Sequence, residues 1–236
     1  MPTQNISHSA SREADLPETT VTRARLSRGA SNNSIYGMVR DALVRLSITG
    51  ETLVDVGCGE GKLWDFLSGQ FERYIGIDIL QHKSGFPGVF VQANLDVQPI
   101  PLPSNSANVV TAVEVIEHLE NPRAFMRELV RIVKPNGWVI VTTPNQASLL
   151  SKFTFILKNQ FNEFQDSSYP AHITALLESD LLRLNKECFL GKVGTYYSLR
   201  GRVPFTASQF PKFLSRLFPR AFSDNILVIG CKVSDY

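Results

Sequence analysis

The sequence predicts an α/β fold in which helices cover both faces of a largely parallel sheet. Short apolar runs alternate along the chain with stretches whose apolar residues follow helical spacing, which is typical of such folds. The run 108–113 is apolar almost without a break, as strands buried on both faces are. The first run ends in a glycine-rich turn over 57–61. Because ligands of these sheets bind where the strands end, we expect the functional site at that turn.

Composition indicates an ordinary globular protein of one large domain. The chain has 236 residues, of which 43% are hydrophobic and 19% charged, and its formal net charge of +2 gives no bulk attraction to nucleic acid or acidic membranes. Its three cysteines, Cys58, Cys188 and Cys231, are widely spaced, so we expect reduced thiols. No apolar run reaches the ~18 residues that span a bilayer. The polar N-terminus lacks a signal-peptide core, and a cytoplasmic protein is expected.

The chain divides into a tail and a single domain. Residues 1–33 are rich in Ser, Thr, Arg and Asn, so we expect a flexible N-terminal tail with a solvated Arg23, Arg25 and Arg28. Residues 34–236 are predicted to form one domain with a lid-like insertion at about 147–171. The predicted helices are 35–48, 62–68, 122–133 and 174–186, and the predicted strands are 52–56, 74–79, 89–92, 108–113, 138–143, 188–197 and 225–233.

The glycine turn reads Val54-Asp55-Val56-Gly57-Cys58-Gly59-Glu60-Gly61. Glycine has no Cβ to block close approach of a ligand, and the helix that follows begins with unpaired N–H groups. The spacing is G-x-G-x-G rather than the G-x-G-x-x-G of dinucleotide sites, and no Gly-Lys-Ser/Thr ending of a phosphate loop is present. In these residues the chain resembles class I S-adenosylmethionine-dependent methyltransferases, and the resemblance covers about 51–146.

The resemblance implies a Rossmann-like class I methyltransferase fold with a seven-stranded sheet, mostly parallel with an antiparallel last strand, and helices on both faces. It also implies S-adenosylmethionine as the cofactor, with the acid and glycines of the turn around its methionine part. The expected cofactor-binding residues are Asp55, Gly57, Cys58, Gly59, Gly61, Asp78, Ile79, Leu80, Asn94, Leu95 and Val113.

Two positions after the turn are expected to bind the nucleoside. Asp78 ends the second predicted strand, where an acid accepts from two ribose hydroxyls, and the resemblance implies that Ile79 or Leu80 packs on the adenine. A nicotinamide-dependent dehydrogenase would also use such an acid, and a solvent-facing Asp78 is a further alternative. Relatives commonly carry an acid that accepts from the adenine amine where Asn94 stands, and an Asn oxygen can accept that bond. Asp96 as the adenine partner, or Asn94 as an ordinary turn residue, are the alternatives.

The stretch Glu114-Val-Ile-Glu117-His118 resembles an element of ubiquinone-biosynthesis-type O-methyltransferases and small-RNA 2′-O-methyltransferases. In those relatives the acids and the His, with a further His downstream, can hold a divalent metal. The resemblance therefore implies Glu114, Glu117, His118 and His172 as ligands of Mg²⁺, Mn²⁺ or Zn²⁺. The alternative is a metal-free site in which His118 is a general base or lines the acceptor pocket. We expect His118, Glu114 and Glu117 to be catalytic, and His172 and Asn145 to lie in the acceptor pocket.

Aromatic and basic residues gather in the insertion and near the C-terminus. These residues are Phe153, Phe155, Phe161, Phe164, Phe205, Phe210, Phe213, Phe218 and Phe222, with Lys212, Arg216 and Arg220 beside them. Such a face could make peripheral membrane contact or meet a lipid-linked acceptor. Aromatic side chains at this spacing also form cores, so both interpretations stay open.

The sequence thus predicts methyl transfer from S-adenosylmethionine, to an oxygen of a small molecule, a glycan or a lipid precursor. Metal-assisted RNA 2′-O-methylation is an alternative that the near-neutral charge disfavours, because a continuous basic stripe is lacking. A NAD-dependent oxidoreductase, which the glycine spacing disfavours, and a non-catalytic cofactor-binding protein are alternatives from other classes.

Overall fold

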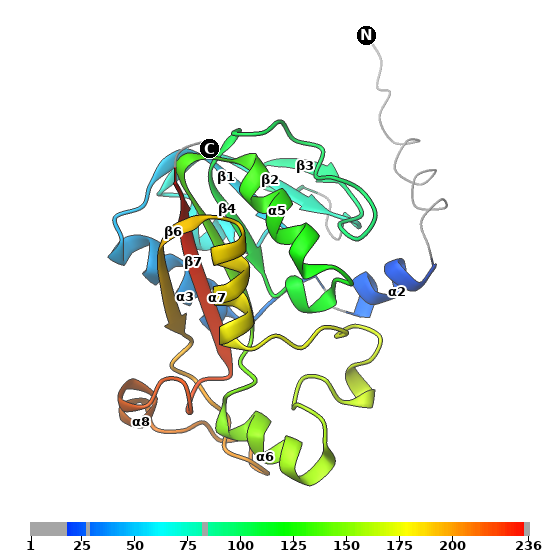
Figure 1. Ribbon diagram of the computed structural model, residues 1–236, viewed down its shortest axis with the longest axis vertical. Helices are drawn as coiled ribbons and strands as arrows, with labels where there is room; N and C mark the ends of the chain where they lie inside the picture. Colours follow the sequence, from blue (N-terminus) through cyan, green and yellow to red (C-terminus); the bar gives the residue numbers. More distant parts are fainter. Residues whose placement is uncertain (1–17, 27–28, 82–84, 234–236) are drawn as a thin grey trace.

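Seven strands form one sheet at the centre of the molecule, shown by the computed structural model over residues 18–26, 29–81 and 85–233. The strands are β1 (Gly50–Val56), β2 (Phe71–Asp78), β3 (Val89–Gln92), β4 (Ala107–Val113), β5 (Val133–Pro144), β6 (Leu190–Tyr197) and β7 (Asn225–Lys232). Their order is β3-β2-β1-β4-β5-β7-β6, and only β7 runs antiparallel to its neighbours (Figure 1). The predicted seven-stranded, mostly parallel sheet with an antiparallel last strand is confirmed.

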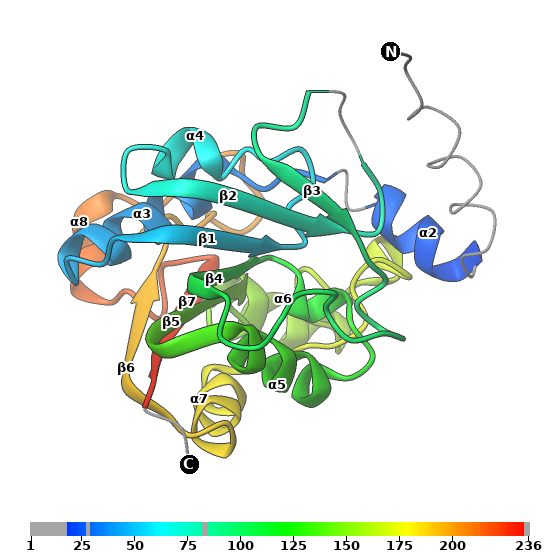
Figure 2. The same cartoon turned by 90° about the horizontal axis from the view of Figure 1, so that it is seen from above.

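Helices cover both faces of this sheet (Figure 2). On one face α3 (Asn33–Arg45) and α4 (Trp64–Leu67) pack in one apolar cluster, and on the other α5 (Pro122–Ile132) and α7 (Glu178–Glu187) pack in a second. Leu53 and Val54 are neighbours in β1 but belong to opposite clusters, because successive side chains of a strand point to opposite faces. Two covered faces therefore explain the unbroken apolar runs in the sequence.

Asparagine side chains begin two of these helices. Asn32 and Asn121 each accept a backbone N–H of the first turn at 3.0 Å, and Pro122 takes a first-turn position in α5. The helix predicted over 35–48 ends earlier, at Arg45, and the helix predicted over 62–68 shortens to the four residues of α4.

A helix, α2 (Glu18–Leu26), stands where we expected a flexible tail. The expectation is therefore wrong for 18–26, and α3 already begins at residue 33. Arg23 is only 8% exposed rather than solvated, because two carboxylates offset its loss of water. Arg25 is exposed, whereas residues 1–17 and Arg28 lie outside the described residues.

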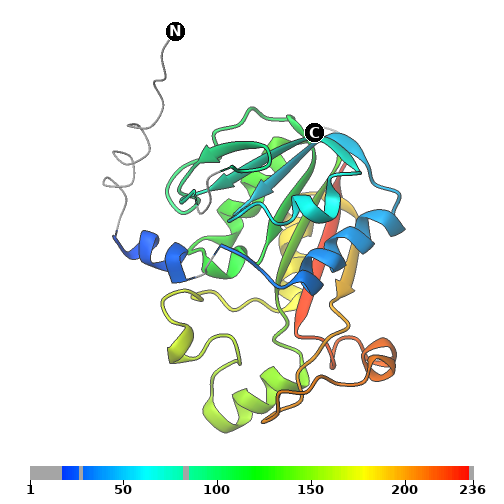
Figure 3. The same ribbon diagram turned by 180° about the vertical axis from the view of Figure 1, so that it is seen from behind.

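Further short elements extend beyond the carboxyl ends of the parallel strands (Figure 3). The connection from β5 to α7 carries α6 (Leu149–Lys158) and η2 (Asp166–Ser168), and the connection from β6 to β7 carries α8 (Lys212–Leu217). The predicted insertion at 147–171 therefore holds α6 and η2. Within the described ranges, none of the helices has the length and apolarity needed to cross a membrane.

Candidate active site

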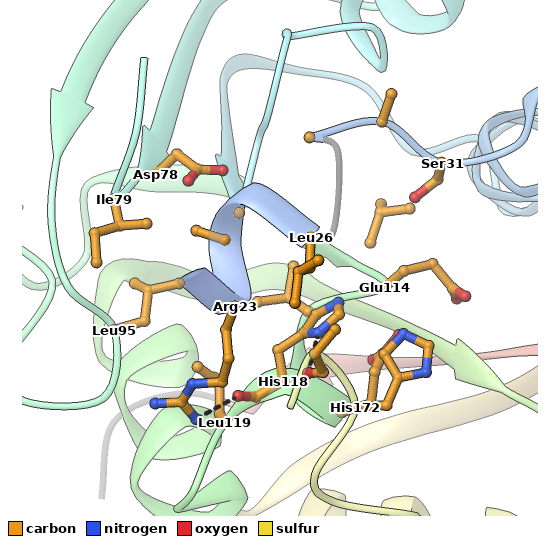
Figure 4. A pocket seen from close by; sticks show the side chains of 18 of the residues that line it. Arg23, Leu26, Ser31, Asp78, Ile79, Leu95, Glu114, His118, Leu119 and His172 are labelled. Carbon is orange, nitrogen blue, oxygen red and sulfur yellow. Dashed lines mark hydrogen bonds between the residues drawn. The ribbon is translucent and has the colours of Figure 1, made fainter. Parts of the chain in front are cut away.

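A cavity of about 680 Å³ opens where the parallel strands end. Its walls come from the segments after β1, β2, β3 and β4, from α2 and the turn into α3, and from the segment that follows α6. Figure 4 shows Asp78 on one side and His118 and His172 on the other, with Arg23 and Leu26 of α2 between them. This is the edge of the sheet at which the glycine turn lies.

The glycine turn adopts a backbone that other residues rarely adopt. Gly57, Gly59 and Gly61 have φ angles of +75°, +52° and +77°. A Cβ on Gly59 would lie 1.9 Å from the carbonyl oxygen of Gly29, so the turn packs directly against the segment between α2 and α3. Gly57 and Cys58 line the cavity, whereas Gly59 and Gly61 do not. Gly59 and Gly61 shape the turn, and their contact with the cofactor stays a prediction.

Asp55 borders the cavity from the end of β1 and is only 3% exposed. Its Oδ1 accepts from Thr111 Oγ1 at 2.8 Å and its Oδ2 accepts from the Tyr74 hydroxyl at 2.7 Å. Burial raises the pKa of Asp55 to about 6, although the two hydrogen bonds act in the opposite direction. The carboxyl group is therefore fixed by its neighbours on β2 and β4.

Asp78 ends β2, as predicted, and faces the cavity with Ile79. Its Oδ2 accepts from Gly59 N at 2.9 Å and its Oδ1 accepts from Leu80 N at 3.2 Å. Each carboxylate oxygen has two lone pairs, so both can also accept from hydroxyls of a ligand. Leu80 does not line the cavity but packs with Ile79 and Ala24 of α2.

Asn94 lies in the cavity wall and is 2% exposed, and the predicted Leu95 and Val113 line the same cavity. Its Oδ1 accepts from Asp96 N at 3.1 Å, and its Nδ2 has no hydrogen-bond partner in the described part of the chain. We expected the oxygen to bind the adenine amine, but the structure presents the N–H group instead. Leaving a buried donor unpaired costs about 1–3 kcal/mol. The site therefore fits a ligand that places an acceptor here.

Arg23 of α2 joins three groups beside the cavity. Its Nη2 lies 3.0 Å from Asp96 Oδ2 and 3.3 Å from Glu120 Oε1, and its Nη1 donates to the carbonyl oxygen of His118 at 3.1 Å. Asp96 also accepts from Glu120 N at 3.0 Å, so both of its oxygens are engaged. Each oxygen keeps a second lone pair, as in Asp78, so Asp96 stays an alternative as the adenine partner. Reasoning from sequence missed Arg23, because its partners stand 73 to 97 positions away.

Glu114 follows β4 with a φ of +55° and borders the cavity. Its Oε1 accepts from Thr142 Oγ1 and its Oε2 from Asn225 Nδ2, both at 2.8 Å. Burial raises the pKa of Glu114 well above its ordinary value, and the nearby carboxylate of Glu117 raises it further. The carboxyl group is thus held by β5 and β7.

Glu117 lies in η1 (Ile116–His118) and is fully buried. Its Oε2 accepts from Thr143 Oγ1 at 3.1 Å, while its Oε1 lacks a partner among the residues that the structure describes. Burial raises the pKa of Glu117 to about 8. A buried oxygen of this kind calls for a proton, a ligand hydroxyl or a metal ion.

His118 and His172 lie against each other, with ring centroids 4.8 Å apart. The Nδ1 of His118 is 2.7 Å from the carbonyl oxygen of Ala171, and that of His172 is 2.7 Å from the carbonyl oxygen of Glu163. Because a carbonyl only accepts, each Nδ1 carries a proton and each neutral ring keeps its lone pair on Nε2. Burial lowers the pKa of both rings, and His118 lowers that of His172 further.

Three of the four predicted metal ligands gather in one place. Glu117, His118 and His172 each bring a ligand atom to within 4.8 Å of the others. Carbonyl acceptors at Nδ1 are the partners that commonly orient metal-binding imidazoles. Glu114 does not join them, which corrects the predicted set, because Thr142 and Asn225 hold its two oxygens.

Asn145 does not line the cavity, contrary to the expected acceptor contact. Its Nδ2 donates to the carbonyl oxygens of Arg220 and Ser223, both at 2.8 Å, and its Oδ1 accepts from Ala147 N at 3.0 Å. These bonds tie the end of β5 to the segment before β7. Asn145 is therefore a structural residue.

Tyr36 and Ser31 also line the cavity and were missing from the predicted site. The Tyr36 hydroxyl accepts from Ser31 N at 2.8 Å, which orders the segment in front of α3. The helical spacing that begins at residue 35 could have indicated these two residues. A helix that leads into β1 starts near the glycine turn, so the residues at its start lie close to the site.

Comparison with known proteins places this geometry in context. The family model described as a methyltransferase domain matches residues 33–188. A probable S-adenosylmethionine-dependent methyltransferase of Mycobacterium tuberculosis is 36% identical over 104 residues, which cover 42% of this chain and 37% of that protein. A ubiquinone biosynthesis O-methyltransferase of Bordetella pertussis is 28% identical over 109 residues, covering 42% and 45%. The chain thus spans less than half the length of these curated relatives.

Solved structures share the fold. A methyltransferase from Archaeoglobus fulgidus that depends on S-adenosylmethionine has a TM-score of 0.60 at 17% identity, covering 84% of this chain and 94% of that one. A chain from the complex of the Haloferax volcanii Trm112 methyltransferase activator with its methyltransferase has a TM-score of 0.65 at 16% identity, covering 93% and 99%. These comparisons favour an S-adenosylmethionine site at the glycine turn over a nicotinamide site.

Proposed function

The chain belongs to the methyltransferase-domain family, and on this premise we propose that it transfers a methyl group from S-adenosylmethionine to an oxygen of a small molecule, a glycan or a lipid precursor. The observation that supports the proposal most is that one cavity joins the two halves that such a reaction needs. One half has the glycine turn, Asp78 and Asn94, and the other has Glu117, His118 and His172.

The chain's own residues fit the cofactor in the first half. The buried, unpartnered Nδ2 of Asn94 matches an acceptor nitrogen of the adenine ring, and the Asp78 carboxylate can still accept from ribose hydroxyls. Gly57 permits close approach to the methionine part, and α2 contributes Arg23, Ala24 and Leu26 to the cavity wall. S-adenosylmethionine, when bound, supplies an electrophilic methyl group.

The second half fits an acceptor hydroxyl. A neutral His118 with its proton on Nδ1, donated to Ala171 O, has an Nε2 lone pair that can take the hydroxyl proton. The unpartnered Oε1 of Glu117 lies in the same cluster and can accept from that hydroxyl. Positioning the acceptor and removing its proton are the main tasks of the protein in an in-line methyl transfer.

Metal-assisted O-methylation is a second candidate, which the grouping of Glu117, His118 and His172 favours. These residues would hold a divalent ion, which would supply Lewis-acid stabilisation of an acceptor oxygen. An RNA 2′-hydroxyl is one acceptor of this kind, although a net charge of +2 provides little attraction for RNA.

Calorimetric titration of S-adenosylhomocysteine into metal-stripped protein tests the first proposal. Asp78→Ala removes a charged acceptor for the ribose, so we expect about tenfold or greater weakening, since hydrogen bonds to charged groups contribute about 1.5–3 kcal/mol. Asp65→Ala is the matched control, because Asp65 is an exposed acid of α4 outside the cavity. Folded wild-type protein that binds no S-adenosylhomocysteine would refute the proposal.

The metal is tested in the same protein by titrating Mn²⁺ and Zn²⁺. His172→Ala should abolish ion binding and leave S-adenosylhomocysteine binding intact if the cluster holds a metal. Glu120→Gln is the control, because its exposed carboxylate lies near the cluster but outside it. Unchanged methyl transfer in metal-free protein, together with its loss in His118→Gln, would favour the base over the metal.

A further inference from the structure

The helix α6 turns its apolar stripe away from the protein. Leu149, Phe153, Ile156 and Leu157 recur at the spacing of one helix face and are 38%, 37%, 78% and 59% exposed. A helix on the surface of a globular protein normally buries such a stripe against the core. Here the stripe faces outward.

The inward face of α6 is polar instead. Ser151 and Thr154 are its buried residues. Ser151 Oγ donates to Gln146 Oε1 at 3.1 Å, and Thr154 Oγ1 donates to the carbonyl oxygen of Leu150 at 2.9 Å. The side of α6 that faces the protein is thus polar, and its large apolar side chains lie on the outward side.

The helix α8 likewise buries a polar side chain and exposes apolar ones. Ser215 is fully buried and donates to the carbonyl oxygen of Phe222 at 2.9 Å, whereas Phe213, Leu217 and Phe218 are 66%, 67% and 54% exposed. Both helices therefore expose large apolar side chains. The two helices lie at the same end of the molecule (Figures 1 and 3).

Contacts of α6 with the segments on either side of α8 join the two helices into one surface. Phe153 of α6 packs edge-on against Phe205, which is 84% exposed in the segment before α8, with ring centroids 5.2 Å apart. Leu149 N donates to the carbonyl oxygen of Ala221 at 2.8 Å, which ties the start of α6 to the turn after α8. We call the exposed apolar residues of α6 and α8, together with Phe205, the α6–α8 surface.

The two segments that carry the α6–α8 surface are basic, although Arg202 pairs with Glu163 and Asp224 just outside them. The segments 146–162 and 198–223, which carry both helices, contain seven Lys and Arg residues and no Asp or Glu. Lys152, Lys212 and Arg216 are exposed and form no ion pair within the described ranges. The formal net charge of the whole chain is only +2, so positive charge is concentrated at this end.

We propose that the α6–α8 surface docks on an anionic lipid bilayer, with its apolar side chains in the interfacial region and its Lys and Arg residues among the headgroups. Apolar side chains flanked by cations are the pattern of interfacial membrane binding. Aliphatic residues such as Ile156 and Leu217 would contribute nothing to binding nucleic acid, and two cationic surfaces of this kind would repel each other in a dimer.

Docking in this orientation would bring the cavity close to the lipid. The segment 163–172 follows α6 directly and contributes Glu163, Tyr169 and His172 to the cavity wall. An acceptor carried in the membrane would therefore reach the cavity from the side of α6. Membrane docking itself does not depend on the proposed methyl transfer, because it can be measured without turnover.

Co-sedimentation of the full chain with vesicles tests the proposal. Vesicles of equal parts phosphatidylcholine and phosphatidylglycerol should bind the protein, and vesicles of phosphatidylcholine alone should bind it weakly. The variant Ile156→Ser/Leu157→Ser/Leu217→Ser should lower the partition coefficient on anionic vesicles by about tenfold or more, as expected for removing three large apolar side chains. These side chains are exposed, so the folded protein should tolerate the changes.

Matched controls separate docking from general surface effects. Val44→Ser/Val97→Ser removes apolar side chains that are 61% and 69% exposed elsewhere, and should leave vesicle binding unchanged. Lys152→Gln/Lys212→Gln should weaken binding, whereas Lys186→Gln/Lys192→Gln, which removes the same charge near β6, should not.

Three results would overturn the proposal. The first is absence of binding to the anionic vesicles by wild-type protein. The second is an equal loss of binding in the serine variant and its valine control. The third is a different occupant: self-association in sedimentation velocity, or binding of single-stranded RNA, that the serine variant abolishes while the vesicles bind nothing.

Discussion

The direction of the hydrogen bond at Asn94 can be tested by changing one atom. Asn94→Asp keeps an oxygen to accept from Asp96 N but replaces the unpartnered Nδ2 donor with an oxygen. If Nδ2 donates to adenine N1, the substitution places two acceptors against each other. Losing the bond and leaving a buried acceptor unpaired costs about 1–3 kcal/mol, which weakens S-adenosylhomocysteine about five- to 160-fold.

The assay compares S-adenosylhomocysteine with its inosine analogue by calorimetric titration. In the inosine ring N1 carries a proton, so it clashes with a donor and suits an acceptor. Wild-type protein should therefore prefer the adenine ligand, and Asn94→Asp should prefer the inosine ligand. Asn105→Asp adds the same charge at an exposed position outside the cavity and should leave the preference unchanged.

Equal or tighter binding of S-adenosylhomocysteine by Asn94→Asp would show that Nδ2 does not donate to adenine. In that case the amide oxygen would accept from the adenine amine, as the family resemblance implies, and the bond from Asp96 N would not set the orientation of the amide.

Three further predictions concern the walls of the cavity. Burial raises the pKa of Asp55 from 3.8 to about 6, so its contribution to the unfolding free energy is present below about pH 4 and is lost as the pH rises to about 6. Two pKa units correspond to about 3 kcal/mol; Asp55→Asn should flatten this dependence in urea unfolding, and equal pH profiles would contradict the assignment. Gly59→Ala should lower the unfolding free energy by at least about 1 kcal/mol, because a left-handed backbone costs about that much and the new Cβ would overlap the carbonyl oxygen of Gly29; unchanged stability would count against the geometry. Arg23→Met leaves Asp96 without its cation, so amide hydrogen exchange in α2 should rise and S-adenosylhomocysteine should bind less tightly, while the urea midpoint changes little. Unaltered exchange in α2 would show that the ion pair does not hold the helix.

The fold could be predicted because local patterns determine it. Leu53 and Val54 point to opposite faces of β1 and are both fully buried, and that is why the strand shows as an unbroken apolar run. The glycine turn that follows requires positive φ at three positions, which only glycine adopts readily. Neither feature depends on knowing which distant residues meet.

The site could be predicted as a location, because the ends of parallel strands meet at one edge of a sheet. Asp78 after β2 and Glu114 after β4 both reach the cavity for this reason. The role of an individual atom could not be predicted. Whether Asn94 offers its oxygen or its N–H depends on one bond from Asp96 N, and whether Glu114 is open to a ligand depends on Asn225, more than a hundred residues away.

Two segments outside the matched range of the family complete the site. Arg23 of α2 precedes residues 33–188 and holds the carbonyl oxygen of His118, and Asn225 of β7 follows that range and holds the carboxyl group of Glu114. The residues that we expect to meet the acceptor are therefore oriented by parts of the chain that the family model does not describe. The cofactor half of the cavity is built from residues within the family's range, whereas the acceptor half is oriented from outside it. Such a division is consistent with one fold serving many acceptors. For this chain, selectivity should thus respond more to changes in α2 and β7 than to changes in the glycine turn.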